Sequence, residues 1–183
     1  MRYFSRTVVT AAAVAMAACA SDATAPEARD DVATPPTETE APAALTDGGV
    51  FAQAIATGEW VWYRLSADTL SPASDSPHAA RLRTRYNPTA AASLDADGKV
   101  AEATVFSNGS LIVKEVYGDD GALAFVAVMI KAAGDPNAGH GDWLWAEYDA
   151  NGNVTQSIAA PEETCHSCHF SGVDHTRMND AHP

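Results

Sequence analysis

Two cysteines and a histidine near the carboxyl end have the spacing that is best suited to chemistry, in the segment Cys165-His166-Ser167-Cys168-His169. On one turn of helix, the two thiols of C-x-x-C-H reach the vinyl groups at one edge of a haem, and the following histidine points at the iron. The alternative is a zinc site completed by His166 or His175, which needs more donors than this tail offers. The export signal at the amino end of the chain, described below, also favours a haem over a zinc ion. The motif therefore predicts one covalently attached haem c, with His169 as its iron ligand.

The second axial position of the iron depends on residues outside the motif. Only 14 residues follow His169, too few for the long C-terminal segment that carries the methionine ligand in small electron-transfer cytochromes. A sixth ligand would come from the preceding domain, where His78, His140 and Met129 are the candidates. Each has an ordinary alternative, because the histidines lie in polar loops and Met129 lies in an apolar strand. We expect an open sixth position, which suits the binding of a small molecule.

Large apolar side chains before and within the expected strands could line a pocket beside this position. Phe106, Phe125 and Met129 are the candidates, and core packing explains each of them equally well. Lys114 would share a strand face with Ile112 and Val116, an unusual neighbourhood for a lysine. It either contacts the haem or extends along apolar surface to an ion-pair partner.

The first residues have the pattern of an export signal. Arg2 and Arg6 precede an apolar run over 8–18 that is too short to span a membrane, and small residues lead into Cys19. Met16-Ala17-Ala18-Cys19 is similar to a bacterial lipobox, which predicts that Cys19 is acylated. Ordinary cleavage that leaves an unmodified thiol is the alternative. We expect an exported protein, periplasmic or an outer-membrane lipoprotein of a Gram-negative bacterium.

The residues after Cys19 differ in composition from the rest of the chain. Residues 19–45 are built mainly from Ala, Thr, Pro, Asp and Glu, with few large apolar side chains. Such a segment cannot bury enough surface to offset its ordering entropy, so it predicts a disordered, lipid-anchored linker. The predicted organisation is a signal peptide over 1–18, this linker over 19–45 and one haem domain over 46–183.

The chain is acidic, with a formal net charge of −13 at pH 7. Nucleic acid and anionic lipid headgroups are therefore poor partners, and the lipid anchor is the one membrane contact that we predict. The same acidity would attract a basic redox partner, although it also serves solubility alone. A redox partner and a second copy of the chain remain open as partners.

The folded part reads mainly as β-structure. Helical spacing is limited to about 50–55, 88–94 and the segment that follows Pro161. Strands are predicted at 60–65, 81–86, 111–117, 122–131, 142–148 and 154–159, with tight turns at 118–121 and 149–152. We predict a mainly β member of the α+β class: an antiparallel β-meander with short helices and a C-terminal haem-attachment helix.

Several segments together carry a family resemblance that covers about Glu59 to His169. In chain order they are Arg83–Pro88, Asn108–Val116, Val128–Lys131, Gly141–Trp145 and Cys165–His169. Their order and spacing resemble the cytochrome P-460 and cytochrome c′-beta family. The resemblance implies a β-rich domain with a C-terminal attachment motif, in agreement with the strand pattern.

The resemblance also implies roles for particular residues. The P-460 branch of that family cross-links a strand lysine to the porphyrin and oxidises hydroxylamine, and Lys114 stands at the matching position. Its hydroxylamine oxidisers place a carboxylate over the haem from the following strand. Residues 122–131 contain no Asp or Glu, and Ala127 stands at that place in the predicted distal pocket. The tail over 173–177 also departs from the family pattern. Without a base near the iron, proton removal from a substrate would be slow.

Three hypotheses for function follow. The first is a pentacoordinate haem protein that binds nitric oxide or a similar small gaseous or nitrogenous ligand. The second is an oxidoreductase that oxidises hydroxylamine or nitric oxide, with Lys114 cross-linked to the haem. The third is a simple electron-transfer cytochrome c whose sixth ligand is a protein side chain.

Overall fold

The computed structural model describes residues 43–71, 76–78 and 81–177, all within the unit Thr39–Pro183. The predicted signal peptide, the lipidation site at Cys19 and most of the predicted linker lie outside the described residues. Within the described ranges, no helix combines the length and the apolar composition that crossing a bilayer requires.

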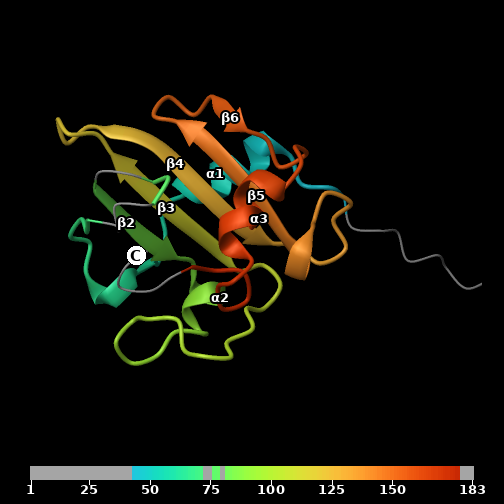
Figure 1. The fold of residues 1–183 in the computed structure, drawn as a ribbon, viewed down its shortest axis with the longest axis horizontal. Coiled ribbons are helices and arrows are strands. Elements are labelled where there is room, and N and C mark those ends of the chain that lie inside the picture. The colour runs from blue at the N-terminus through green and yellow to red at the C-terminus, as the bar shows by residue number, and fades with distance from the viewer. Residues whose placement is uncertain (1–42, 72–75, 79–80, 178–183) are drawn as a thin grey trace, which may run out of the picture. The chain divides into compact units, whose positions relative to one another are not determined.

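Six strands form a single antiparallel sheet whose spatial order follows the chain from β1 to β6 (Figure 1). Their bounds are β1 Val61–Trp62, β2 Arg81–Tyr86, β3 Leu111–Tyr117, β4 Leu123–Lys131, β5 Trp143–Asp149 and β6 Val154–Gln156. Each strand pairs with the next one in sequence, and the described residues also form three short α-helices, α1 Asp47–Ile55, α2 Pro88–Ala91 and α3 Glu163–His169. The prediction of a mainly β meander with short helices is confirmed.

Helices α1 and α2 begin where the sequence provides a cap. The Thr46 Oγ1 accepts a hydrogen bond from the Gly49 N–H at 3.1 Å, which satisfies one of the free donors at the start of α1. Asn87 does the same for α2, because its Oδ1 accepts from the Ala90 N–H at 2.9 Å. The same oxygen also accepts from the Leu111 N–H at 3.0 Å, so α2 is tied to the start of β3.

The predicted strand over 60–65 is shorter than expected. Only Val61 and Trp62 pair with β2, and the chain then turns through a 3-10 helix over Tyr63–Leu65 with Arg64 at a φ of 56°. The turn places the Tyr63 ring in the core, and the Arg64 N–H donates to the Gly98 carbonyl at 3.1 Å. Burial of the tyrosine therefore outweighs the strand preference of this aromatic segment.

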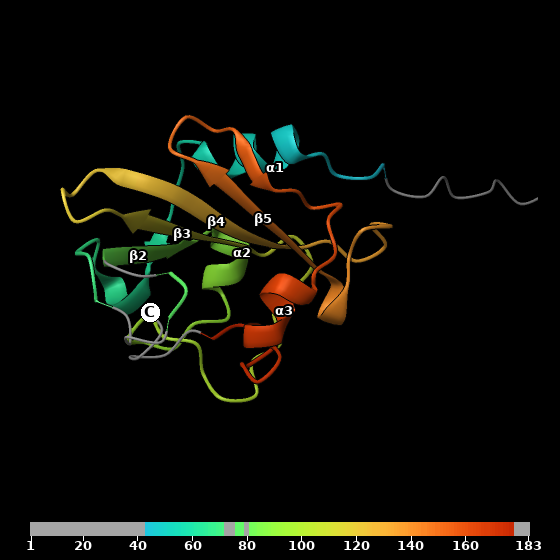
Figure 2. The same ribbon diagram turned by 45° about the horizontal axis from the view of Figure 1, so that its top comes forward.

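The sheet separates two apolar cores. Helix α1 covers one face, while α2 and α3 lie on the other (Figure 2). The first core packs Val50 and Ala54 of α1 against the sheet, and the second is rich in aromatic residues, with Tyr63, Tyr86, Phe106, Trp143 and Trp145. Each fully buried large side chain contributes about 1.5–3 kcal/mol to the free energy of folding. Helix α3 packs against this second core.

The register of the central strands places a polar row on this second face. Lys114 pairs with Ala127, which pairs with Glu147, so these three side chains project from one face on adjacent strands. The next row holds Ile112, Met129 and Trp145. Neighbouring strands are about 4.8 Å apart, so the small Ala127 side chain leaves room between Lys114 and Glu147.

Candidate functional site

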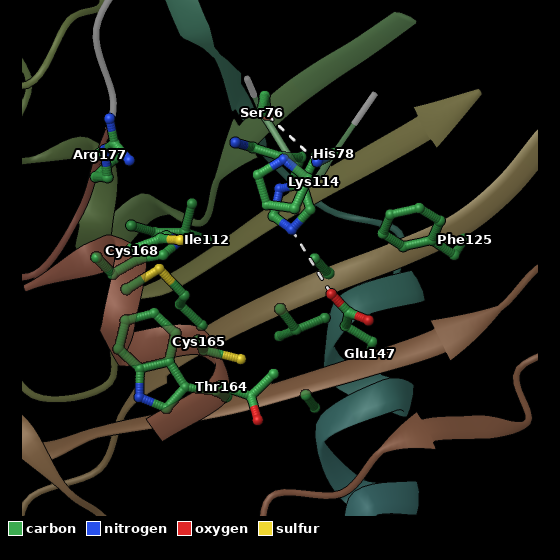
Figure 3. A pocket seen from close by; sticks show the side chains of 17 residues that line it. Ser76, His78, Ile112, Lys114, Phe125, Glu147, Thr164, Cys165, Cys168 and Arg177 are labelled. Atoms are coloured by element: carbon green, nitrogen blue, oxygen red, sulfur yellow. Dashed lines mark hydrogen bonds and ion pairs between the residues drawn. The ribbon is translucent and has the colours of Figure 1, made fainter. Parts of the chain in front are cut away.

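A cavity of about 440 Å³ lies on the second face of the sheet (Figure 3). Its walls come from α3, from β3, β4 and β5, from the segment 76–78 and from Arg177. Most of the lining side chains are apolar, with a few charged groups among them. Cofactor and ligand sites are typically apolar cavities of roughly 300–1,000 Å³ with a few convergent polar groups, and this cavity has both properties.

Helix α3 presents three reactive side chains to the cavity. Cys165, Cys168 and His169 all line it, because residues three and four apart share one face of a helix. Both cysteines are free thiols. Burial raises the pKa of the Cys165 thiol to about 11, with the Glu147 carboxylate as the next cause, so this thiol is protonated at neutral pH. One wall of the cavity thus carries two thiols and an imidazole.

The imidazole of His169 is oriented by the backbone. Its Nδ1–H donates to the His175 carbonyl at 2.9 Å, which leaves Nε2 as the nitrogen available to a metal. The Trp145 ring meets it edge-on, with the ring centroids 4.8 Å apart. Burial lowers the pKa of His169 to about 4, although the bond to His175 partly opposes this. The imidazole is therefore neutral at physiological pH, the form that coordinates iron.

His166 belongs to a separate cluster on another face of α3. Its ring stacks on His140 with centroids 3.7 Å apart, and the His175 ring lies 5.2 Å away. Across 43–71, 76–78 and 81–177, no three His, Cys, Asp or Glu side chains converge as a metal ion would require. The zinc alternative therefore has no donor set in this part of the chain, and burial of Cys165 disfavours the thiolate that zinc needs.

Lys114 lines the cavity and lies in a desolvated position. Burial lowers the pKa of its amine to about 8, and the positive charge of Arg177 contributes to the shift. Between the ordinary pKa of 10.5 and this value the unfolded chain binds more protons, so stability of the haem-free protein rises with pH across that window. Lys114 therefore lies in the apolar neighbourhood that the strand pattern predicts for it.

The site also contains an acidic group that no motif in the sequence singled out. Glu147 projects from β5 beside Ala127, and its Oε1 lies 3.6 Å from the His78 Nε2 (Figure 3). Strand β4 has no carboxylate at this position, and Glu147 of the neighbouring strand β5 provides one beside Ala127. Alternation along Trp143, Trp145 and Glu147 would have placed Glu147 on this face, whereas no local pattern points to Arg177.

The other predicted pocket residues divide between the cavity and its surroundings. Phe125, Ala127 and Met129 line the cavity, and Met129 is also part of the aromatic core. Phe106 lies outside the cavity wall: it is 2% exposed and packs edge-on against Trp143, the core packing that was the alternative for this residue.

The three predicted candidates for a sixth ligand also separate. His78 and Met129 line the cavity. The side chain of His140 is 56% exposed, lies 3.3 Å from Glu162 and is not part of the cavity wall. Of the three candidates, His78 and Met129 are therefore the ones that line the cavity beside His169.

Comparison with models of protein families shows which family the chain belongs to. The model of the Cytochrome P460 family matches residues 83–176, a range that begins within β2, includes β3 to β6 and all of α3, and covers most of the cavity wall. The chain belongs to the cytochrome P460 family. The search among curated proteins gave no match. Membership of this family makes the protein a haem-binding cytochrome.

The residues of the cavity fit a haem. His169 offers a neutral imidazole nitrogen, and Lys114 and Arg177 supply positive charge for the carboxylates that a haem carries. The Trp145 ring, which meets His169 edge-on, also lines the cavity and would give a bound haem an aromatic surface to pack against.

Proposed function

We propose that the cytochrome binds one haem c through Cys165, Cys168 and His169 and uses an open sixth position to bind a small neutral ligand such as nitric oxide. One observation carries the proposal: α3 presents both thiols and the imidazole on one wall of a cavity whose other walls are mainly apolar. The bound haem would supply an iron that takes a diatomic ligand on its free face.

The chain contributes orientation and exclusion of water. His169 is fixed by the carbonyl of His175, which sets the tautomer and the plane of the ring. Ile112 and Phe125 make the cavity hydrophobic, which favours a neutral ligand over water. Met129 is 8% exposed and held within the aromatic core, so its thioether is part of the packing that surrounds the cavity.

The open position gives a spectroscopic prediction. We expect the ferrous protein to be high-spin and to take up carbon monoxide and nitric oxide without displacing a protein ligand. Met129→Ala and His78→Ala should leave the spin state unchanged, because neither side chain occupies the sixth position. Optical spectra of the reduced protein and its two variants, with and without carbon monoxide, make the measurement.

One spectroscopic result would contradict the prediction of an open sixth position. A low-spin spectrum in both redox states that becomes high-spin in either variant would contradict an open position. It would favour the electron-transfer cytochrome, with a redox partner in place of a small ligand. His140→Ala serves as the matched control, since His140 is solvent-exposed and lies outside the cavity wall.

A second candidate function is the oxidation of hydroxylamine or nitric oxide. It is favoured by the polar row in the cavity, where Glu147 lies beside His78 and faces Lys114 across Ala127. Glu147 could accept a proton from a bound substrate, the role that β4 does not fill. A strongly red-shifted ferrous Soret band would indicate Lys114 cross-linked to the haem and would support this function over simple ligand binding.

We also propose export and membrane attachment through an acylated Cys19, on the pattern of residues 1–19. The protein should then fractionate with membranes, and Cys19→Ser should move it to the soluble fraction, because the acyl chains are its only expected membrane contact. Mass spectrometry of the amino terminus makes the check. A mature chain that begins at another residue and carries no acyl group would contradict the anchor.

A further inference from the structure

The carbonyl that orients His169 lies in a short segment with unusual backbone geometry. After α3 the chain turns back through Gly172, and both Asp174 and His175 have positive φ angles, 45° and 62°. Such left-handed conformations are unfavourable for residues with a Cβ, so they persist only where surrounding contacts hold them. The contacts that hold this segment therefore determine where the His175 carbonyl lies.

Those contacts converge on Asp174. Its Oδ2 accepts hydrogen bonds from the Lys131 Nζ at 2.6 Å and from the Phe106 N–H at 2.8 Å. Its main-chain carbonyl accepts from the Trp143 Nε1 at 2.9 Å. The peptide immediately before the His175 carbonyl is thus tied both to the end of β4 and to the start of β5.

The ion pair between Lys131 and Asp174 is buried, so it holds the segment after α3 firmly against the sheet. The side chains of Lys131 and Asp174 are each 9% exposed, and the Lys131 ammonium also lies 5.3 Å from the centre of the Trp143 ring. Charges that are desolvated and paired in this way interact strongly, and loss of one partner leaves the other uncompensated. The pair joins residues 43 positions apart in the chain and connects the sheet to the segment after α3.

We infer that Lys131 and Asp174 are positioning residues for the iron ligand: the ion pair fixes the His175 carbonyl and so sets the strength of the His169 Nδ1–H hydrogen bond. A histidine that donates this second bond more strongly is a more basic ligand and favours the ferric over the ferrous state. The pair would then tune the redox balance and ligand affinity of the haem. This inference rests on the proposed function, in which His169 binds the iron.

The decisive variant is the double substitution Lys131→Met with Asp174→Asn. It removes the ion pair without leaving an unpaired buried charge, and asparagine can still accept from Phe106. We expect the iron–histidine stretching band of the ferrous protein to move to lower frequency in resonance Raman spectra. At a fixed potential, we expect the ferrous-to-ferric ratio to rise by about threefold to tenfold, the effect of weakening one hydrogen bond.

Two further variants separate positioning from general damage. Trp143→Phe removes the donor to the Asp174 carbonyl, keeps an aromatic ring in the core and leaves the ion pair in place, so it should shift both readouts in the same direction by a smaller amount. The matched control is Arg83→Met with Glu115→Gln, which removes an ion pair of the same length, 2.6 Å, from the other face of the sheet, together with the 3.4 Å ion pair of Glu115 with Arg85. This control should leave the stretching band and the redox ratio unchanged.

The outcomes distinguish this inference from the proposed function. An unshifted band and an unchanged redox ratio in folded double and Trp143→Phe variants would overturn the inference while the haem site stands. Wild-type protein that loses its haem to acid-acetone, or an iron–histidine band that survives in His169→Ala, would instead overturn the proposed site. If a protein ligand fills the sixth position, the redox ratio still tests the inference, because it responds to the basicity of His169 in either coordination state.

Discussion

Replacing Cys165 and Cys168 together with alanine is expected to abolish haem staining of the polypeptide after denaturing electrophoresis. Both thiols line the cavity beside His169, and neither is engaged in a disulfide. A thioether survives denaturation, whereas an iron–imidazole bond does not, so only covalent attachment keeps the haem with the unfolded chain. The effect should be a complete loss of the haem signal.

The control for this experiment lies between the two cysteines. His166→Ala changes a residue of the same helix whose ring faces His140 rather than the cavity, so haem staining should persist. Each single cysteine variant should keep reduced staining through the remaining thioether. Extraction of the colour from wild-type protein by acid-acetone would contradict covalent attachment.

Much of the fold could be predicted because local patterns decide it. Strands β2 and β3 occupy the predicted bounds, since alternation along Arg81–Tyr86 and the β-branched run before Tyr117 leave few alternatives. Turn signals at Gly118–Gly121 and Asp149–Gly152 then determine which strands pair. The aromatic segment after Trp60 was less predictable, because burial of Tyr63 depends on residues distant in sequence.

The candidate site was predictable only where a motif or a strand face carries it. The C-x-x-C-H segment identifies Cys165, Cys168 and His169 because their spacing within one helix is sufficient. The Glu147–His78 contact joins a strand to a distant loop, so no local signal indicates it. The absence of an acid from β4 suggested a cavity without a base, yet in an antiparallel sheet the neighbouring strand supplies a side chain to the same row.

The acid–histidine pair in the cavity leads to the second large effect. Glu147 Oε1 lies 3.6 Å from His78 Nε2, and Lys114 and Arg177 also line the cavity. At pH 7 Lys114 is mostly protonated, because its pKa of about 8 lies above that pH, and Arg177 is always charged. Carboxylates and imidazoles are the usual general bases, so we expect this pair, rather than Lys114 or Arg177, to accept a proton from a bound ligand.

Two ligands of similar size can test whether it does so. Hydrogen cyanide is protonated at neutral pH and must lose its proton as it binds ferric haem, whereas carbon monoxide binds ferrous haem without proton transfer. We expect Glu147→Gln to slow cyanide association at pH 7 by about a hundredfold, the lower end of the usual contribution of a general base. Carbon monoxide association should change little, because the glutamine side chain has nearly the same size. Stopped-flow measurements of both ligands give the two rates.

The difference between the cyanide and carbon monoxide association rates separates a loss of proton transfer from obstructed access to the haem. Glu163→Gln removes the same charge from an exposed position on α3, so both rates should remain those of the wild type. His78→Gln should resemble Glu147→Gln if the imidazole passes the proton to the carboxylate. Equal slowing of cyanide and carbon monoxide would show that the substitutions obstruct access instead. Unchanged cyanide rates in both variants would remove the base from the cavity, and with it the main support for hydroxylamine oxidation over simple ligand binding.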